Sequence, residues 1–185
     1  ELAATIDNPV VLEYGEVTSN GNFHGAPVGY VLDFLAIAAT DLSSISERRT
    51  DRMLDRYRSS GLSPFLAGDA GVDSGLMIAQ YTQAALVSEN KRLSVPASVD
   101  SIPSSAMQED HVSMGATGAH RTFIMTKYLS QVLANELICS SEAMNRIEEN
   151  PGKGVKRIHN WMKLKIYSPC SLRQAIYFLL SCSCF

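Results

Sequence analysis

The chain has 185 residues, 45% of them hydrophobic and 19% charged, values typical of an ordinary soluble globular protein rather than a disordered or fibrous one. Its formal net charge of −3 gives no electrostatic argument for a nucleic acid or an anionic membrane as partner. No apolar run approaches the roughly 18 to 20 residues that span a bilayer, so we expect no membrane insertion and a cytoplasmic location.

The first 26 residues are mostly loop. Residues 10–17 could form a short hairpin with its turn near Gly15. The glycine- and asparagine-rich segment Ser19–Gly25 follows and contains a single aromatic residue, Phe23. Phe23 either anchors this loop to the core or lines an aromatic pocket, and the local sequence fits both interpretations.

A long helix is predicted from about residue 27 to 54, opened by Pro27 and carrying apolar residues at steps of three and four. At 1.5 Å per residue this helix would be roughly 40 Å long, which exceeds what a compact monomer of this size needs. Near its end, Glu47-Arg48-Arg49 is either a solvated charge cluster or a set of buried ion pairs, and burial statistics favour the solvated cluster.

Two more helices are expected, one from Asp73 or Ser74 to a point before Pro96, and one from His111 to about residue 148. Three long helices in series with almost no strand signal predict an all-α bundle with little or no β structure. Residues 150–185 differ in character, because basic residues cluster after a Pro-Gly break, and this part either adds one or two short helices or does not fold.

Four polar residues, Gln108 to His111, stand where the loop before the third helix ends. Ser105-x-x-Gln108 fits a capping box, which would place Glu109 and Asp110 in the first helical turn. Alternatively, Glu109 points into a polar pocket and binds a substrate. The stretch by itself leaves both interpretations open.

General catalytic and metal motifs are not found. The sequence has no His-Glu-x-x-His helix, no Gly-x-Ser-x-Gly elbow and no phosphate-binding loop. His111 and His120 lie too far apart to share one helical face, and Cys182-x-Cys184 is too short for a zinc pair, so no metal site is expected. Cys139 lies within a helical pattern and is expected in the core.

Seven motifs, however, occur together in the order and approximate spacing of one enzyme family. They are Asp7-Asn8-Pro9, Gly21-Asn22-Phe23-His24-Gly25, Ser44-Ile45-Ser46-Glu47-Arg48-Arg49, Ser74-Gly75-Leu76-Met77-Ile78-Ala79-Gln80, Ser88-Glu89-Asn90-Lys91, Pro96-Ala97-Ser98-Val99-Asp100-Ser101-Ile102-Pro103 and Gln108-Glu109-Asp110-His111-Val112-Ser113-Met114-Gly115. Over roughly residues 5–144 the chain resembles histidine ammonia-lyase, and it corresponds to a stretch in the later half of that longer family chain.

The resemblance implies an all-α fold of the aspartase/fumarase-like type, with long helices forming the core of a homotetramer. It implies the elimination of ammonia from L-histidine to give trans-urocanate, a step of histidine degradation. The family's electrophile is a methylidene-imidazolone (MIO) ring that forms from an Ala-Ser-Gly tripeptide, so no cofactor is bound from outside. Active sites in the family combine residues of three subunits, and neither nucleic acid nor a membrane is implied as a partner.

Few site residues carry over. Glu109 matches the family's substrate-facing, catalytic glutamate, and Phe23 matches the aromatic residue that lines the pocket. Gln108 and His24 flank them as further substrate-binding candidates. Phenylalanine-handling relatives carry glutamine at the positions of Glu109 and His24, which favours histidine as the substrate here. A carboxylate can accept a hydrogen bond from an imidazole N–H.

Two departures qualify the resemblance. The chain contains no Ala-Ser-Gly, so it is expected to be a fragment that is inactive when isolated. Residues 1–149 are assigned to the helical catalytic domain, and residues 150–185 form a divergent tail. The alternatives are a phenylalanine or tyrosine ammonia-lyase or aminomutase, and a catalytically inactive helical scaffold.

Overall fold

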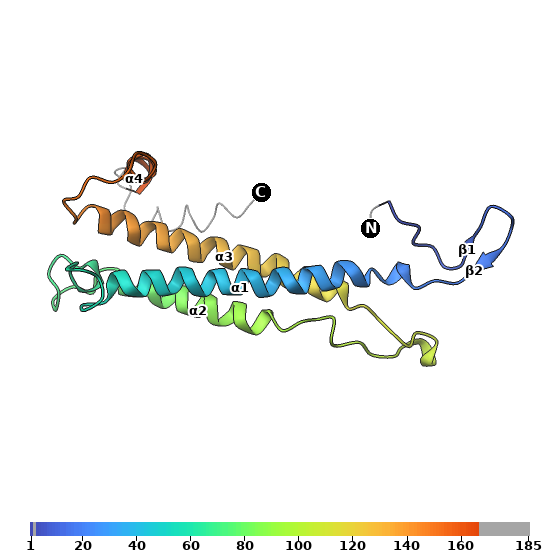
Figure 1. The fold of residues 1–185 in the computed structure, drawn as a ribbon. Helices are drawn as coiled ribbons and strands as arrows, with labels where there is room; N and C mark the ends of the chain where they lie inside the picture. The colour runs from blue at the N-terminus through green and yellow to red at the C-terminus, as the bar shows by residue number, and fades with distance from the viewer. Residues whose placement is uncertain (2, 167–185) are drawn as a thin grey trace. The chain divides into compact units, whose positions relative to one another are not determined.

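The computed structural model describes residues 1 and 3–166 (Figure 1). Its elements are β1 (Val10–Val11), β2 (Val17–Thr18), η1 (Asn22–His24), α1 (Ala26–Leu54), η2 (Pro64–Leu66), α2 (Met77–Leu93), η3 (Ser105–Met107), α3 (Gly115–Met144) and α4 (Lys153–Ile166). The two strands are two residues long each, so helices carry the fold and the predicted all-α class is confirmed.

The described chain forms two compact units. The first consists of Glu1–Ala39 and Lys91–Met125, and the second of Thr40–Asn90 and the described residues from Thr126 onward. Helices α1 and α3 each contribute one part to each unit. The candidate site residues all belong to the first unit.

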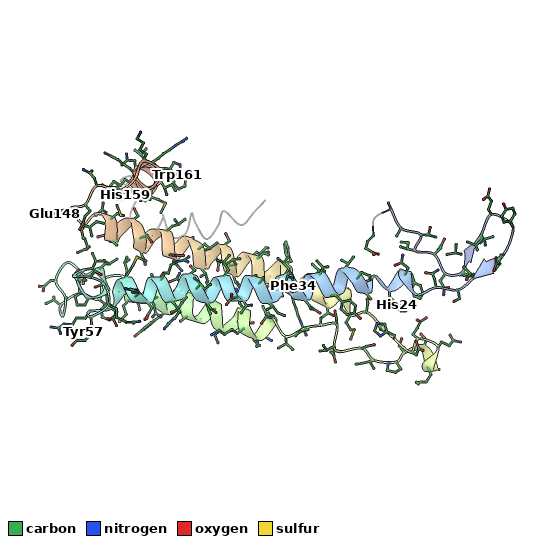
Figure 2. The ribbon with its side chains drawn as sticks, in the orientation of Figure 1. His24, Phe34, Tyr57, Glu148, His159 and Trp161 are labelled. Carbon is green, nitrogen blue, oxygen red and sulfur yellow. The ribbon has the colours of Figure 1, made fainter. Side chains whose placement is uncertain are left out.

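The predicted hairpin and the first long helix are confirmed. In the hairpin Val10 pairs with Thr18 and Val11 with Val17 in antiparallel register. Helix α1 begins one residue before Pro27, whose fixed φ and missing N–H suit a first helical turn. The described part of the basic segment after residue 150 forms one helix, α4, and Figure 2 shows His159 and Trp161 on it. The rest of the predicted tail, residues 167–185 with Cys182-x-Cys184, lies outside the described residues.

The predicted starts of α2 and α3 are wrong by several residues. Helix α2 begins at Met77, because the Asp73 carboxylate instead accepts the backbone N–H groups of Gly75 at 2.7 Å and Asp69 at 2.9 Å and forms a turn. Helix α3 begins at Gly115, not at His111, and ends at Met144.

Asp33 on α1 organises the first unit. Its buried carboxylate accepts the backbone N–H groups of Ala97 at 2.9 Å and Ser98 at 2.8 Å, which fixes the segment after α2. Burial acts to raise the pKa of Asp33, but its interactions with Ser98 and Ala97 outweigh burial, and the pKa lies below its ordinary value.

Close helix packing in the same unit requires small residues. A Cβ at Gly29 on α1 would lie 3.4 Å from the Cα of Gly115, the first residue of α3. Thr122 on α3 donates its hydroxyl to the backbone oxygens of Gly118 at 2.9 Å and of Leu32 at 3.3 Å. These contacts hold the start of α3 close to the first turns of α1.

The second unit contains a buried charge network, and the expectation of a solvated Glu47 is wrong. The Glu47 side chain is 6% exposed. Its carboxylate accepts hydrogen bonds from the Arg48 guanidinium at 2.6 Å and from the side-chain amide of Gln80 on α2 at 2.7 Å. Burial raises the pKa of Glu47, but the hydrogen bonds from Arg48 and Gln80 bring it below its ordinary value. The Arg48 side chain itself is 62% exposed, as predicted.

Glu136 on α3 repeats this pattern. It accepts the Ser46 hydroxyl at 2.6 Å and is paired with the Arg49 guanidinium of α1. One turn further along α3, Cys139 is fully buried, as predicted, and burial together with the charge of Glu136 raises the pKa of its thiol to about 12. The polar contacts set the register of α1 against α3 within this unit.

By length and composition alone, one described helical stretch, Asn22–Leu54, could cross a membrane. This helical stretch is longer than any uninterrupted run of apolar residues in the sequence. It buries Ser43, Ser46 and Thr50, which hydrogen-bond within the protein. Buried polar contacts of this kind are typical of a helix that packs in a protein bundle.

Candidate functional site

Three of the four predicted site residues come together in the first unit. His24 Nε2 lies 3.2 Å from Glu109 Oε2. The rings of Phe23 and His24 lie 4.1 Å apart between centroids, tilted by 34°. His24 and Phe23 belong to η1, just before α1, where Figure 2 labels His24. Glu109 belongs to the loop between α2 and α3, so the site joins two distant segments.

A short turn holds η1 in place. No side-chain hydrogen bond caps η1 at its N-cap residue, Gly21. The side-chain oxygen of Asn20 accepts the Asn22 N–H at 2.9 Å, and the Asn22 side-chain amide donates to the carbonyl of Thr5 at 3.0 Å. Gly25 follows at φ 64°, a left-handed conformation that glycine adopts without strain. The chain therefore turns sharply from η1 into α1.

Glu109 lies on a closed loop and not in a helix, so the predicted capping box is wrong. Ser105, Ala106 and Met107 all have positive φ, between 51° and 70°. The loop is closed by a pair of backbone hydrogen bonds, from Ser104 N–H to Glu109 O at 2.9 Å and from Glu109 N–H to Ser104 O at 3.2 Å. The Glu109 side chain is 38% exposed and projects from this loop.

The imidazole of His24 has neighbours on several sides. His111 meets it edge to face, with centroids 6.4 Å apart. Ser101 Oγ lies 3.4 Å from Nδ1 of His111 and accepts the backbone N–H of Val112 at 3.0 Å. The hydroxyl of Ser113 donates a short hydrogen bond to the backbone oxygen of His24. The His24 side chain is consequently only 17% exposed.

The structure places Gln108 differently from Phe23, His24 and Glu109. Gln108 is exposed, and its backbone N–H donates to the carbonyl of Ser105 at 3.2 Å. Sequence reasoning missed the parts played by Ser113 and Ser101. Both lie in motifs that carried the resemblance, and their short hydroxyl side chains in loop segments were the available signal.

Chemically, the cluster presents one carboxylate, one imidazole and one aromatic face. A carboxylate only accepts hydrogen bonds when ionised, so Glu109 suits a ligand that offers an N–H group. Phe23 is 42% exposed and offers an apolar surface next to His24. Among residues 1 and 3–166, no group of three or more His, Cys, Asp or Glu side chains could hold a metal ion.

The residues present do not fit the formation of an MIO ring. Ser59-Ser60-Gly61 and Asp73-Ser74-Gly75 are the nearest sequences to Ala-Ser-Gly, and both make hydrogen bonds that hold the local fold. The Ser59 hydroxyl donates to the carbonyl of Leu62 at 3.2 Å, and the Gly75 N–H is bound by Asp73. No reaction step is therefore assigned to such a ring within this chain.

The chain is similar to several known proteins. It is 70% identical over 144 residues to histidine ammonia-lyase of Streptomyces avermitilis, a match that spans 78% of this chain and 28% of that protein. The crystal structure of histidine ammonia-lyase from Trypanosoma cruzi superimposes with a TM-score of 0.84 at 36% identity, over 95% of this chain and 36% of the other. The phenylalanine aminomutase of Pantoea agglomerans gives a TM-score of 0.84 at 30% identity, over 94% and 35%.

These relatives share the helical ammonia-lyase and aminomutase fold, and the chain spans less than a third of the length of the curated histidine ammonia-lyase from Streptomyces. The family model for aromatic amino acid lyases matches residues 1–163, nearly all of the described chain. With this match over most of its length, the chain belongs to the aromatic amino acid lyase family.

Proposed function

We propose that this chain is part of a histidine ammonia-lyase, which eliminates ammonia from L-histidine without oxidation and releases trans-urocanate. The observation that carries the proposal is the partly exposed Glu109 carboxylate, which contacts His24, in a chain 70% identical over 144 residues to a histidine ammonia-lyase. The His24 ring in turn contacts the ring of Phe23. A carboxylate and an aromatic ring in one cluster match an imidazole, which is aromatic and carries an N–H donor.

Glu109 is the proposed catalytic, substrate-contacting residue. It accepts a hydrogen bond from the imidazole N–H of the substrate, or acts on the amino group that leaves. Phe23 lines the pocket against the substrate ring, and Gln108 and His24 complete the proposed binding residues. The two roles of Glu109 differ in their effect on substrate preference: only the contact with the imidazole distinguishes L-histidine from L-phenylalanine.

The electrophile that activates the amino group is proposed to be the MIO ring of the family, formed from a tripeptide outside these 185 residues. The residues of this chain bind and orient the substrate. We further propose the family's homotetramer with shared active sites, a cytoplasmic location, and a helical catalytic domain that includes residues 1–149, with residues 150–185 as a divergent tail.

A chimeric lyase tests this proposal. Residues 1–163 of this chain replace the corresponding residues of the Streptomyces avermitilis histidine ammonia-lyase, and urocanate formation from L-histidine is followed by its ultraviolet absorbance. We expect turnover by the chimera and none by the 185-residue chain alone. A chimera that has the parent's circular dichroism spectrum and unfolding midpoint but forms no urocanate would contradict the proposal and favour an inactive helical scaffold.

A phenylalanine or tyrosine lyase or aminomutase is the second candidate, favoured by the likeness to the Pantoea agglomerans phenylalanine aminomutase. The same chimera distinguishes it when it is offered L-phenylalanine and L-tyrosine. Production of cinnamate, coumarate or a β-amino acid at a higher kcat/KM than urocanate would establish this alternative. We expect histidine to be preferred, because an aromatic ring without an N–H leaves the Glu109 carboxylate without its partner.

A further inference from the structure

We infer that His24 is a positioning residue that fixes the rotamer of Glu109, an inference that rests on the proposed function and deepens it. The starting observation is the 3.2 Å separation between His24 Nε2 and Glu109 Oε2. An ionised carboxylate has no proton to donate, so a hydrogen bond between these two atoms requires a proton on Nε2. In the proposed arrangement His24 is the donor and Glu109 is the acceptor.

A positioning residue has to be better fixed than the group it positions. The His24 side chain is 17% exposed, whereas that of Glu109 is 38% exposed. The His24 ring has two aromatic neighbours, Phe23 with centroids at 4.1 Å and His111 at 6.4 Å. Its backbone is fixed as well, since the Ser113 hydroxyl donates to the His24 carbonyl.

Glu109 has the opposite character. Its backbone is fixed by the two hydrogen bonds to Ser104, but neither of these bonds involves its side chain. A glutamate side chain has three rotatable bonds and loses rotamer entropy when it is ordered. The contact with His24 leaves one carboxylate oxygen, Oε1, for a substrate and restricts where that oxygen can lie. This assignment changes the role of His24 from direct substrate binding to control of Glu109.

The Ser113 contact shows how the two segments stay in register. Ser113 and Glu109 belong to the same loop before α3, and both contact His24, one at its backbone and one at its ring. The loop is thus tied to η1 at two points on a single residue. A shift of η1 relative to the loop would disturb both contacts, so the distance from His24 to Glu109 is well defined.

The test uses the chimeric lyase with His24→Leu and His24→Gln. Leucine removes the donor, whereas the glutamine amide nitrogen can take the place of Nε2. We expect His24→Leu to lower kcat/KM for L-histidine by about 10- to 100-fold, as misplacement of a reacting group by about 1 Å does. His24→Gln should recover most of this loss. His120, an exposed histidine on α3, provides matched control variants, His120→Leu and His120→Gln, which should leave turnover unchanged.

The double variant His24→Leu/Glu109→Gln separates positioning from general damage. If His24 acts through Glu109, the double variant should be no slower than Glu109→Gln alone. Losses that multiply, or a His24→Gln variant as slow as His24→Leu, would overturn the inference. These comparisons need an active parent, and a parent chimera without activity would count against the proposed function instead.

A crystal structure of the chimera with His24→Leu gives a readout that does not depend on activity. We expect the Glu109 carboxylate to leave its position in this variant and to keep it with His24→Gln. An unchanged Glu109 rotamer in the leucine variant would overturn the positioning role, whether or not the chimera turns over L-histidine.

Discussion

Asp33 accepts the backbone N–H of Ala97 at 2.9 Å, so that a buried carboxylate on α1 holds the segment that follows α2. A second N–H, from Ser98, completes the pair at 2.8 Å. Two backbone donors would lose their acceptor together if this side chain were removed. The contact therefore links the stability of the first unit to the charge of one residue.

We expect Asp33→Ala to lower the free energy of unfolding of the chimeric lyase by about 1.5–3 kcal/mol, because hydrogen bonds to a charged acceptor are lost. Asp33→Asn should cost less, because one side-chain oxygen remains as an acceptor. Urea unfolding measures both, and Asp41→Asn, at an exposed position on α1, is the control. Equal midpoints for Asp33→Ala and the parent would contradict the prediction.

The same residue gives a pH dependence. The pKa of Asp33 is lower in the folded state than its ordinary value, so its charge stabilises the fold above about pH 4, the unfolded value, and this contribution is lost as the pH falls through the folded value. The stability difference between parent and Asp33→Asn should shrink on acidification below pH 4. A difference that stays constant from pH 7 to pH 3 would rule out this role.

Glu109→Gln keeps the shape of the side chain and removes its charge. If Glu109 accepts a hydrogen bond from the imidazole, the ratio of kcat/KM for L-histidine to that for L-phenylalanine should fall about 5- to 150-fold, as expected from a penalty of about 1–3 kcal/mol. If it acts on the amino group, both values should fall equally and the ratio should stay the same. Steady-state kinetics of the chimera with both substrates decides between the two roles.

Cys139 should be chemically inert in the folded protein. Burial raises the pKa of its thiol to about 12, so only about 10⁻⁴ of it is thiolate at pH 8. We expect mass spectrometry to find this residue unmodified after iodoacetamide treatment of the native chimera and fully modified after treatment in urea. Rapid alkylation of native protein at this position would show that the site opens readily.

Gly75 occupies a position that no side chain fits. Its φ is +47°, and an added Cβ would lie 2.9 Å from the backbone nitrogen of Ala67 and closer still to the carbonyl of Phe65. Gly75→Ala should therefore lower the free energy of unfolding, measured in urea, by more than the roughly 1–2 kcal/mol of left-handed strain alone. Gly152→Ala, which meets nothing within 4 Å, is the control and should have no effect.

The 185-residue chain by itself should associate. Several large apolar side chains on α1 are exposed in the described structure, among them Phe34 at 74% and Val31 at 67%, and Figure 2 shows Phe34 on this helix. Exposed apolar patches of this kind promote association. Light scattering should report oligomers or aggregates, reduced by Phe34→Ser. A monodisperse monomer would contradict this prediction.

The sequence predicted α1 well because its boundaries depend on local signals, such as Pro27 and a sustained helical period. It placed the start of α3 wrongly because Ser105–Met107 adopts left-handed backbone conformations, which propensities for non-glycine residues do not indicate. Burial of Glu47 depends on Gln80 of another helix, and such a partner cannot be known before the helices are packed.

The candidate site was likewise predicted only in part from the sequence. Resemblance identified Phe23, His24 and Glu109 as separate candidates, but no local pattern predicted that His24 contacts Glu109. That contact joins η1 and the loop before α3, two segments that are far apart in the chain. Proximity of this kind follows from tertiary packing and not from any local pattern, although a histidine and a carboxylate in two motifs of one family form a chemically plausible pair.

The backbone ring that closes between Ser104 and Glu109 has an evolutionary consequence. Both of its hydrogen bonds are made by main-chain atoms, so the loop keeps its shape whatever side chain residue 109 carries. A lineage could exchange this one side chain and acquire a new substrate preference without rebuilding the surrounding fold. The His24 ring contacts the same side chain. We therefore expect a substitution at residue 109 to be compensated by a second substitution at residue 24.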